Sequence, residues 1–104
     1  MIYIQTVDLF IPPDVQDRFE QVVYTYFVPA VRRCPGFLSA SIIADHDDPS
    51  TARLLIYWRD SSASLCAGAN GILVGAYLRM AAVLPGLEIK TAAVEAALPH
   101  KFSG

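Results

Sequence analysis

Charged residues are scarce in this sequence. Only 17% of its 104 residues are charged and 54% are hydrophobic, whereas about a quarter of an average chain is charged. The net charge of −2 lacks the basic excess of a nucleic-acid-binding protein, so we expect no nucleic-acid partner. Polar groups normally cover the large surface of a small domain. The shortage therefore predicts that part of this surface is not exposed to water.

Cysteines and catalytic signature motifs are also few. Cys34 and Cys66 have no metal-binding or CxxC spacing, so we expect two free thiols in a reducing cytoplasm. No charged segment followed by an apolar run opens the chain, which argues against a signal peptide. There is no phosphate-binding glycine loop, HExxH or GxSxG motif. A membrane partner is not expected either, because the apolar segment Ile72–Val83 contains Arg79.

The apolar pattern predicts alternating strands and helices. Ile2–Ile11 is a strand that ends at Pro12-Pro13, and a helical stripe follows from Asp14, in which Pro29 predicts a kink near Val28. Further strands are expected at Phe37–Ala44, Arg53–Trp58 and Leu87–Leu98, with a second helical region that is interrupted at Gly68–Gly71 and continues over Ile72–Val83. Residues 1–98 then form one domain, and residues 99–104 a tail.

The element order βαββαβ predicts a ferredoxin-like α+β fold, in which a four-stranded antiparallel sheet carries both helices on one face. The other face should be polar if it meets water. Instead the strands are apolar on both faces: Ile4 and Phe10 alternate with Val7 and Leu9, and Leu54 with Leu55. We therefore expect a homodimer that is joined sheet to sheet. The alternative is that these apolar side chains are scattered over an ordinary surface.

Two segments resemble a known superfamily. The pattern VPAVRRCPGFLSA (Val28–Ala40), then a hairpin, then LIYWRDSSAS (Leu55–Ser64), is similar to dimeric α/β-barrel proteins, and most of all to antibiotic-biosynthesis-monooxygenase-like (ABM) and EthD-like domains. The resemblance implies a site between the sheet and the helices, with Trp58 as the tryptophan that often lines it. Haem-degrading members use a histidine in the second helical region, where this chain has none, so the resemblance implies no haem here.

The resemblance further implies a small-molecule enzyme, with a cofactor-independent monooxygenase acting on an aromatic or polycyclic substrate as the leading hypothesis. In this chemistry the substrate anion itself reduces O₂, and no cofactor or metal is required. An isomerase of the same superfamily and a non-catalytic domain that binds or senses a metabolite remain as alternatives. Whether the chain is catalytic, and on which substrate, stays open at this point.

Polar residues in apolar surroundings are the candidate site. Arg79 is the only charged residue between Ser61 and Leu87; it either anchors a ligand anion, pairs with an acid or extends into water. Asp8 and Tyr77 are the candidate catalytic residues, although Asp8 could also lie in water and Tyr77 could be packing. The candidate ligand-binding residues are Trp58, Asn70, Arg79 and Phe27. Asn70 could instead cap a helix.

Overall fold

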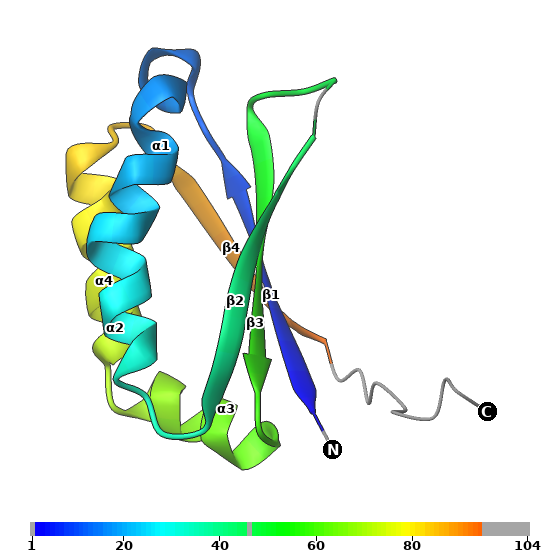
Figure 1. Ribbon diagram of the computed structural model, residues 1–104. Helices are drawn as coiled ribbons and strands as arrows, with labels where there is room; N and C mark the ends of the chain where they lie inside the picture. The colour runs from blue at the N-terminus through cyan, green and yellow to red at the C-terminus, as the bar shows by residue number, and fades with distance from the viewer. Residues whose placement is uncertain (1, 46, 95–104) are drawn as a thin grey trace.

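A four-stranded antiparallel sheet forms one layer of the protein and helices form the other (Figure 1). The computed structural model describes residues 2–45 and 47–94. For residues 91–94 it describes the backbone, which belongs to a strand, and not the side chains. The strands are β1 (Tyr3–Phe10), β2 (Phe37–Ala44), β3 (Thr51–Trp58) and β4 (Glu88–Val94), in the order β2-β3-β1-β4. The predicted ferredoxin-like α+β fold is confirmed. The expected continuation of the last strand to Leu98 and the tail 99–104 lie outside the described residues.

The first helical region is one rod with an irregular centre. It runs through a 3-10 turn η1 (Pro13–Val15), α1 (Gln16–Val22), a π-helical turn η2 (Val23–Phe27) and α2 (Val28–Arg32). Pro29 lies in the first turn of α2, where its missing N–H is least costly. The wider π turn before it accommodates the proline ring, so the predicted irregularity near Val28 is a change of helix type.

The second helical region contains α3 (Ser61–Ala69) and α4 (Ile72–Val83), which meet at an angle of 61°. Asp60 caps α3, because its side chain accepts a hydrogen bond from the N–H of Ala63 at 2.9 Å. Gly71 adopts a φ of +77° between the two helices, a conformation that glycine adopts at no steric cost. The interruption expected at Gly68–Gly71 is therefore a bend between two packed helices.

The core lies between the helices and one face of the sheet. Alternate residues Val7, Leu9 and Ile11 of the first strand segment are buried, as are Leu54, Ile56 and Trp58 of β3. The helices contribute buried side chains along one stripe each: Phe19, Val23, Phe27 and Val31 from the first region, and Leu73, Ala76 and Met80 from α4. Among the described residues, Figure 1 shows no helix on the opposite face of the sheet, which we call the open face.

Candidate functional site

The aromatic residues Phe27 and Tyr77 meet inside the helical layer. The Phe27 ring on η2 stacks on the Tyr77 ring of α4, with centroids 5.9 Å apart and planes inclined by 16°. The Tyr77 hydroxyl is buried, and it forms no hydrogen bond with any described residue. Burial, with a smaller contribution from the Cys34 thiol, raises the pKa of Tyr77 to about 12. At neutral pH this hydroxyl is protonated, so it can donate a hydrogen bond but is a poor base.

Trp58 is fully buried at the end of β3, where its indole has a polar partner. The Nε1–H donates to Oε1 of Gln5 at 3.0 Å, and the hydroxyl of Ser64 on α3 donates to the same oxygen at 3.4 Å. Phe37 meets the indole edge to face, at 6.1 Å between centroids. This small network fixes the orientation of the Gln5 amide beneath α3 and holds Trp58 in one rotamer.

Gln5 and Ser64 are the functional candidates that sequence reasoning missed. Gln5 has the same strand parity as Val7 and Leu9, whose side chains face the helices. A polar residue on the buried face of a strand needs a partner. Strand parity groups Gln5 with Val7 and Leu9, but it could not show which group is buried, because the strand is apolar on both faces. Nothing in the sequence marks Ser64 among the serines of its helix.

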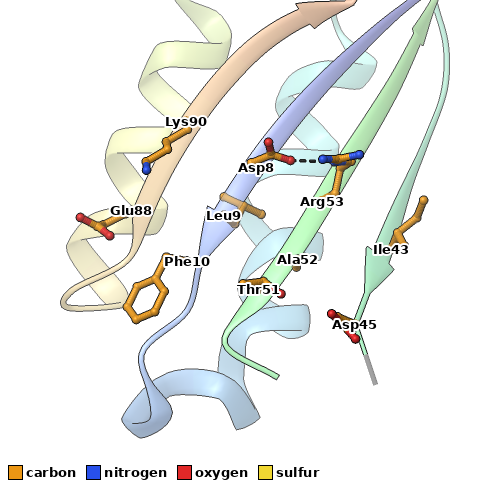
Figure 2. Close-up of a pocket in the computed structure, with 10 residues that line it drawn as sticks. All are labelled: Asp8, Leu9, Phe10, Ile43, Asp45, Thr51, Ala52, Arg53, Glu88 and Lys90. Carbon is orange, nitrogen blue, oxygen red and sulfur yellow. Dashed lines mark hydrogen bonds and ion pairs between the residues drawn. The ribbon is translucent and has the colours of Figure 1, made fainter. Parts of the chain in front are cut away.

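Asp8 lies on the open face of the sheet, not between sheet and helices, so the candidate base does not face the cleft where it was expected. Strand alternation explains this position, because both neighbours of Asp8, Val7 and Leu9, point into the core. Its carboxylate is 2.7 Å from Nε of Arg53, directly opposite on β3 (Figure 2). The two side chains are 47% and 55% exposed, so this ion pair contributes about 1 kcal/mol or less to stability.

A hollow of about 740 Å³ surrounds this ion pair on the open face (Figure 2). Lys90 is opposite Asp8 on the other side, on β4. The remaining lining includes two exposed apolar side chains, Phe10 and Ile43, and two acidic residues, Asp45 and Glu88. If a second copy covers this face, the hollow lies in the interface.

Arg79 is exposed on α4, and it lines neither the open-face hollow nor the cleft between the first helical region and β2. The sequence hypothesis required it to point into the space between helices and sheet, and its position is a correction to that hypothesis. Leu73, Ala76 and Met80 occupy the buried stripe of α4. The sequence could not fix this rotation, because α4 is apolar nearly all round.

Asn70 is also exposed, and its side chain serves the backbone. Its Oδ1 accepts a hydrogen bond from the N–H of Ile72 at 2.9 Å, at the start of α4. This is the helix-capping alternative that the sequence left open, since a side-chain oxygen satisfies one of the free N–H groups of a first turn. A ligand-binding role for Asn70 has no support from this geometry.

A cleft of about 650 Å³ opens between the first helical region and the β2 side of the sheet. Phe19, Glu20 and Tyr24 line its helical wall, and Ala40, Ile42 and Ala44 of β2 line the other wall. Its size lies within the usual range for small-molecule sites, about 300–1,000 Å³. None of the six candidate residues lines this cleft.

Cys34 and Cys66 are both free, as predicted. Burial raises the pKa of the Cys34 thiol, and its Sγ–H donates to the carbonyl oxygen of Ala30 at 3.6 Å. Within residues 2–45 and 47–94, no three side chains of metal-binding type lie close enough to share an ion. Over the same residues no single helix is long and apolar enough to span a membrane. The bent pair α3 and α4 meets the length and hydropathy of a span only when the two helices are counted together.

The fold and interior place the protein in a class, the ferredoxin-like α+β domains with an aromatic interior between sheet and helices and an open sheet face. The family model of antibiotic biosynthesis monooxygenases, ABM, matches residues 2–65. This match spans more than half of the 104 residues, and the chain belongs to this family.

Solved structures share this fold at low sequence identity. A Nitrosomonas europaea protein assigned to the same family is 15% identical with a TM-score of 0.72, and the match covers 94% of this chain and 92% of that one. A mutant, N63A, of SnoaB, a cofactor-independent oxygenase from Streptomyces nogalater, is 20% identical with a TM-score of 0.66, covering 93% and 97%. A Bordetella bronchiseptica protein assigned to the family is 11% identical with a TM-score of 0.75, covering 93% and 98%. No curated protein sequence matches.

Proposed function

We propose that this protein is a small-molecule enzyme of the ABM type, a cofactor-independent monooxygenase whose aromatic or polycyclic substrate binds between the sheet and the helices. The observation that carries this proposal is the Tyr77 hydroxyl, which is buried beside Phe27 without a hydrogen-bond partner among the described residues. Leaving such a group unpaired costs about 1–3 kcal/mol. A ligand oxygen that accepts its hydrogen bond would offset this cost.

In the proposed reaction, a phenolic substrate ionises and its anion reduces O₂. One oxygen atom enters the substrate at a CH₂ carbon, which becomes a carbonyl, and the second oxygen leaves as water with the two hydrogens of that carbon. The chain then has to supply a dry pocket and hydrogen-bond donors for the negative charge that develops on oxygen. Tyr77, protonated at neutral pH because its pKa is raised to about 12, has the properties of such a donor.

The other interior residues have supporting roles in this proposal. Phe27 stacks on Tyr77, and Gln5 and Ser64 hold the indole of Trp58, so a substrate that enters this interior would meet apolar rings on both sides. No charged or polar residue among the described ones is classed as buried. The phenolic proton is therefore expected to pass to solvent rather than to an internal carboxylate, which requires a substrate that is already acidic.

The test compares Tyr77→Phe with the unchanged protein, using a polycyclic phenol and following oxygen consumption. Removing one oxyanion donor is expected to lower kcat by about 10²–10³-fold. The free energy of unfolding is expected to stay the same or to rise, because the variant lacks the unpaired hydroxyl. Tyr24→Phe is the matched control, since the side chain of Tyr24 is 58% exposed. Full activity in Tyr77→Phe would refute the assigned role.

A non-catalytic binding domain is the second candidate, and the lack of a buried carboxylate among the described residues favours it. In that case the same interior holds a metabolite without turning it over. Binding of the phenol without oxygen consumption, weakened in Tyr77→Phe, would identify this function.

We also propose that the protein works as a homodimer in the cytoplasm, with the open faces of two sheets in contact. The support is the half-buried apolar side chains on the open face, Ile4, Leu55 and Tyr57, which no helix of residues 2–45 and 47–94 covers. A second copy would remove this surface from water.

A further inference from the structure

We propose that the cleft between α1, η2 and the β2 side of the sheet is a second ligand site, and that it takes an organic monocation with an apolar body. The cleft has a volume of about 650 Å³, and Tyr77, the residue on which the oxygenase proposal rests, is not part of its lining. The two sites can therefore be tested independently.

The inner surface of the cleft is apolar. Phe19, Ile11 and Ala52 are buried there, and Ile42 is half-buried. This surface can receive an aliphatic or aromatic group, and burying it gives about 25 cal/mol per Å² of apolar area. Two uncharged polar side chains of the lining are already engaged with backbone carbonyls: Gln16 donates from Nε2 to Ile11 at 3.2 Å, and the Thr51 hydroxyl donates to Asp48 at 3.2 Å.

The charges of the cleft have one sign. Glu20 of α1 and Asp45 at the end of β2 line it from the helical and the sheet side, and no described basic side chain lines it. Neither carboxylate forms an ion pair with a described residue. One oxygen of Asp45 accepts the N–H of Asp47 at 2.9 Å, which holds the side chain in place. A cation in this cleft would therefore find acceptors on two walls, whereas an anion would be repelled.

Two aromatic residues add to the preference for a cation. Tyr24 and Phe19 line the cleft, and the negative face of an aromatic ring attracts a cation that lies within about 6 Å. Tyr24 belongs to the π turn η2, between the buried residue Val23 and the exposed residue Thr25. Tyr24 is 58% exposed, so its ring is accessible to a ligand that enters the cleft.

The experiment compares three ligands of similar shape that differ in charge: tryptamine as the ammonium, indole-3-ethanol as the neutral alcohol and indole-3-propionate as the anion. Binding to the full chain is measured by calorimetry and by amide chemical shifts. We expect tryptamine to bind at least about tenfold more tightly than the alcohol, since each tenfold corresponds to 1.4 kcal/mol. We expect no detectable binding of the carboxylate, and amide shifts confined to α1, η2 and β2.

Glu20→Gln should weaken tryptamine binding and narrow its advantage over the alcohol, with Asp45 retaining part of that advantage. The fold should not change, because Glu20 is exposed on α1. Glu88→Gln is the control, since this carboxylate lines the open-face hollow instead. Equal binding of amine and alcohol, an unchanged affinity in Glu20→Gln, or shifts outside the cleft would each overturn the proposal. If Tyr77→Phe loses oxygenase activity but still binds tryptamine, the result supports a cleft site that is separate from the oxygenase site.

Discussion

Trp58 is a buried aromatic residue and Tyr77 a partly buried one, and their buried polar atoms differ in whether they have a hydrogen-bond partner. The indole N–H of Trp58 has Gln5 as an acceptor, which is the usual arrangement inside a protein. The hydroxyl of Tyr77 has no described partner, yet its ring stacks on Phe27 and is held in place. Packing therefore fixes the direction of the hydroxyl without satisfying it, and this combination is common where stability has been exchanged for function.

Tyr77 should make the protein sensitive to alkaline pH. Its pKa is about 12 in the folded chain and 10.0 ordinarily, so between these values the unfolded chain loses the proton while the folded chain keeps it. The free energy of unfolding should then fall as the pH rises above 10, by about 1.4 kcal/mol per pH unit from this group. Tyr77→Phe lacks this loss. Urea unfolding at pH 9 and pH 11 should show that Tyr77→Phe becomes more stable relative to the unchanged protein as the pH rises. Tyr24→Phe is the control. If Tyr77→Phe and the unchanged protein lose the same stability between pH 9 and pH 11, the assignment is wrong.

The positions of single side chains could be predicted from the sequence only where one periodicity was unambiguous. Phe27 lies in a helical stripe with one buried phase and was placed in the interior, whereas the strand of Trp58 is apolar on both faces and Trp58 was placed there by the family resemblance. Asp8 lies in a strand that is apolar on both faces, so the side it faced was open until the pairing with Arg53 was known. Arg79 lies in a helix that is apolar nearly all round, and neighbouring elements decide how that helix is rotated.

At the scale of elements, Gly36 joins three parts of the fold. It precedes β2 with a φ of +86°, and its carbonyl oxygen accepts the N–H of Arg59 at 2.7 Å, which ties the start of β2 to the end of β3. A Cβ atom added at Gly36 would collide with the Cβ of Ala63 in α3. The glycine in the Pro35-Gly36-Phe37 motif is thus needed for backbone conformation and for the close approach of α3.

Gly36→Ala is expected to destabilise the fold by about 2–4 kcal/mol, from a positive φ in a residue with a Cβ and from overpacking against Ala63. Gly71→Ala is the matched control. Gly71 also has a positive φ, +77°, but a Cβ there would meet nothing within 4 Å, so about 1–2 kcal/mol is expected. Chemical denaturation measures both variants. Equal losses in the two would show that the contact with α3 has no energetic weight.

The order and type of the elements could be read from the sequence, because strand and helix periodicities differ and prolines and glycines mark the ends. The π turn η2 was not foreseen as such. Pro29 indicated an irregularity, but helix type depends on how the turn before Pro29 packs against α4. Residue patterns carry no information on that contact.

At the scale of the whole molecule, the exposed apolar side chains of the described residues include two groups that a second copy could cover. The open face carries Phe10 and Ile43, and the outer surface of α3 and α4 carries Leu65, Val74 and Leu78. The scarcity of charge pointed to a covered surface, but it could not separate these two. The homodimer therefore stays a prediction that a variant on each surface can test.

Leu55→Lys should separate the proposed dimer, because it places a charge in the centre of the open face. Light scattering at micromolar concentration is expected to give about twice the mass of the 104-residue chain for the unchanged protein and the mass of one chain for the variant. Leu78→Lys, on the 67% exposed Leu78 of α4, should remain dimeric. A folded monomer of the unchanged protein, or dissociation by Leu78→Lys alone, would contradict the pairing of open faces.

The Asp8–Arg53 pair has a consequence for how the chain avoids misfolding. A slip of β1 by one residue against β3 would turn every side chain of β1 to the opposite face of the sheet. Asp8 would then enter the core near Leu54 and Ile56, and Arg53 would be left without its carboxylate. Burying an unpaired charge costs several kcal/mol, far more than the surface pair contributes. This weak ion pair therefore acts mainly by destabilising wrong registers. Neutralising Asp8 should lower the stability of the native register only slightly, but it should make a β1 register shifted by one residue less unfavourable.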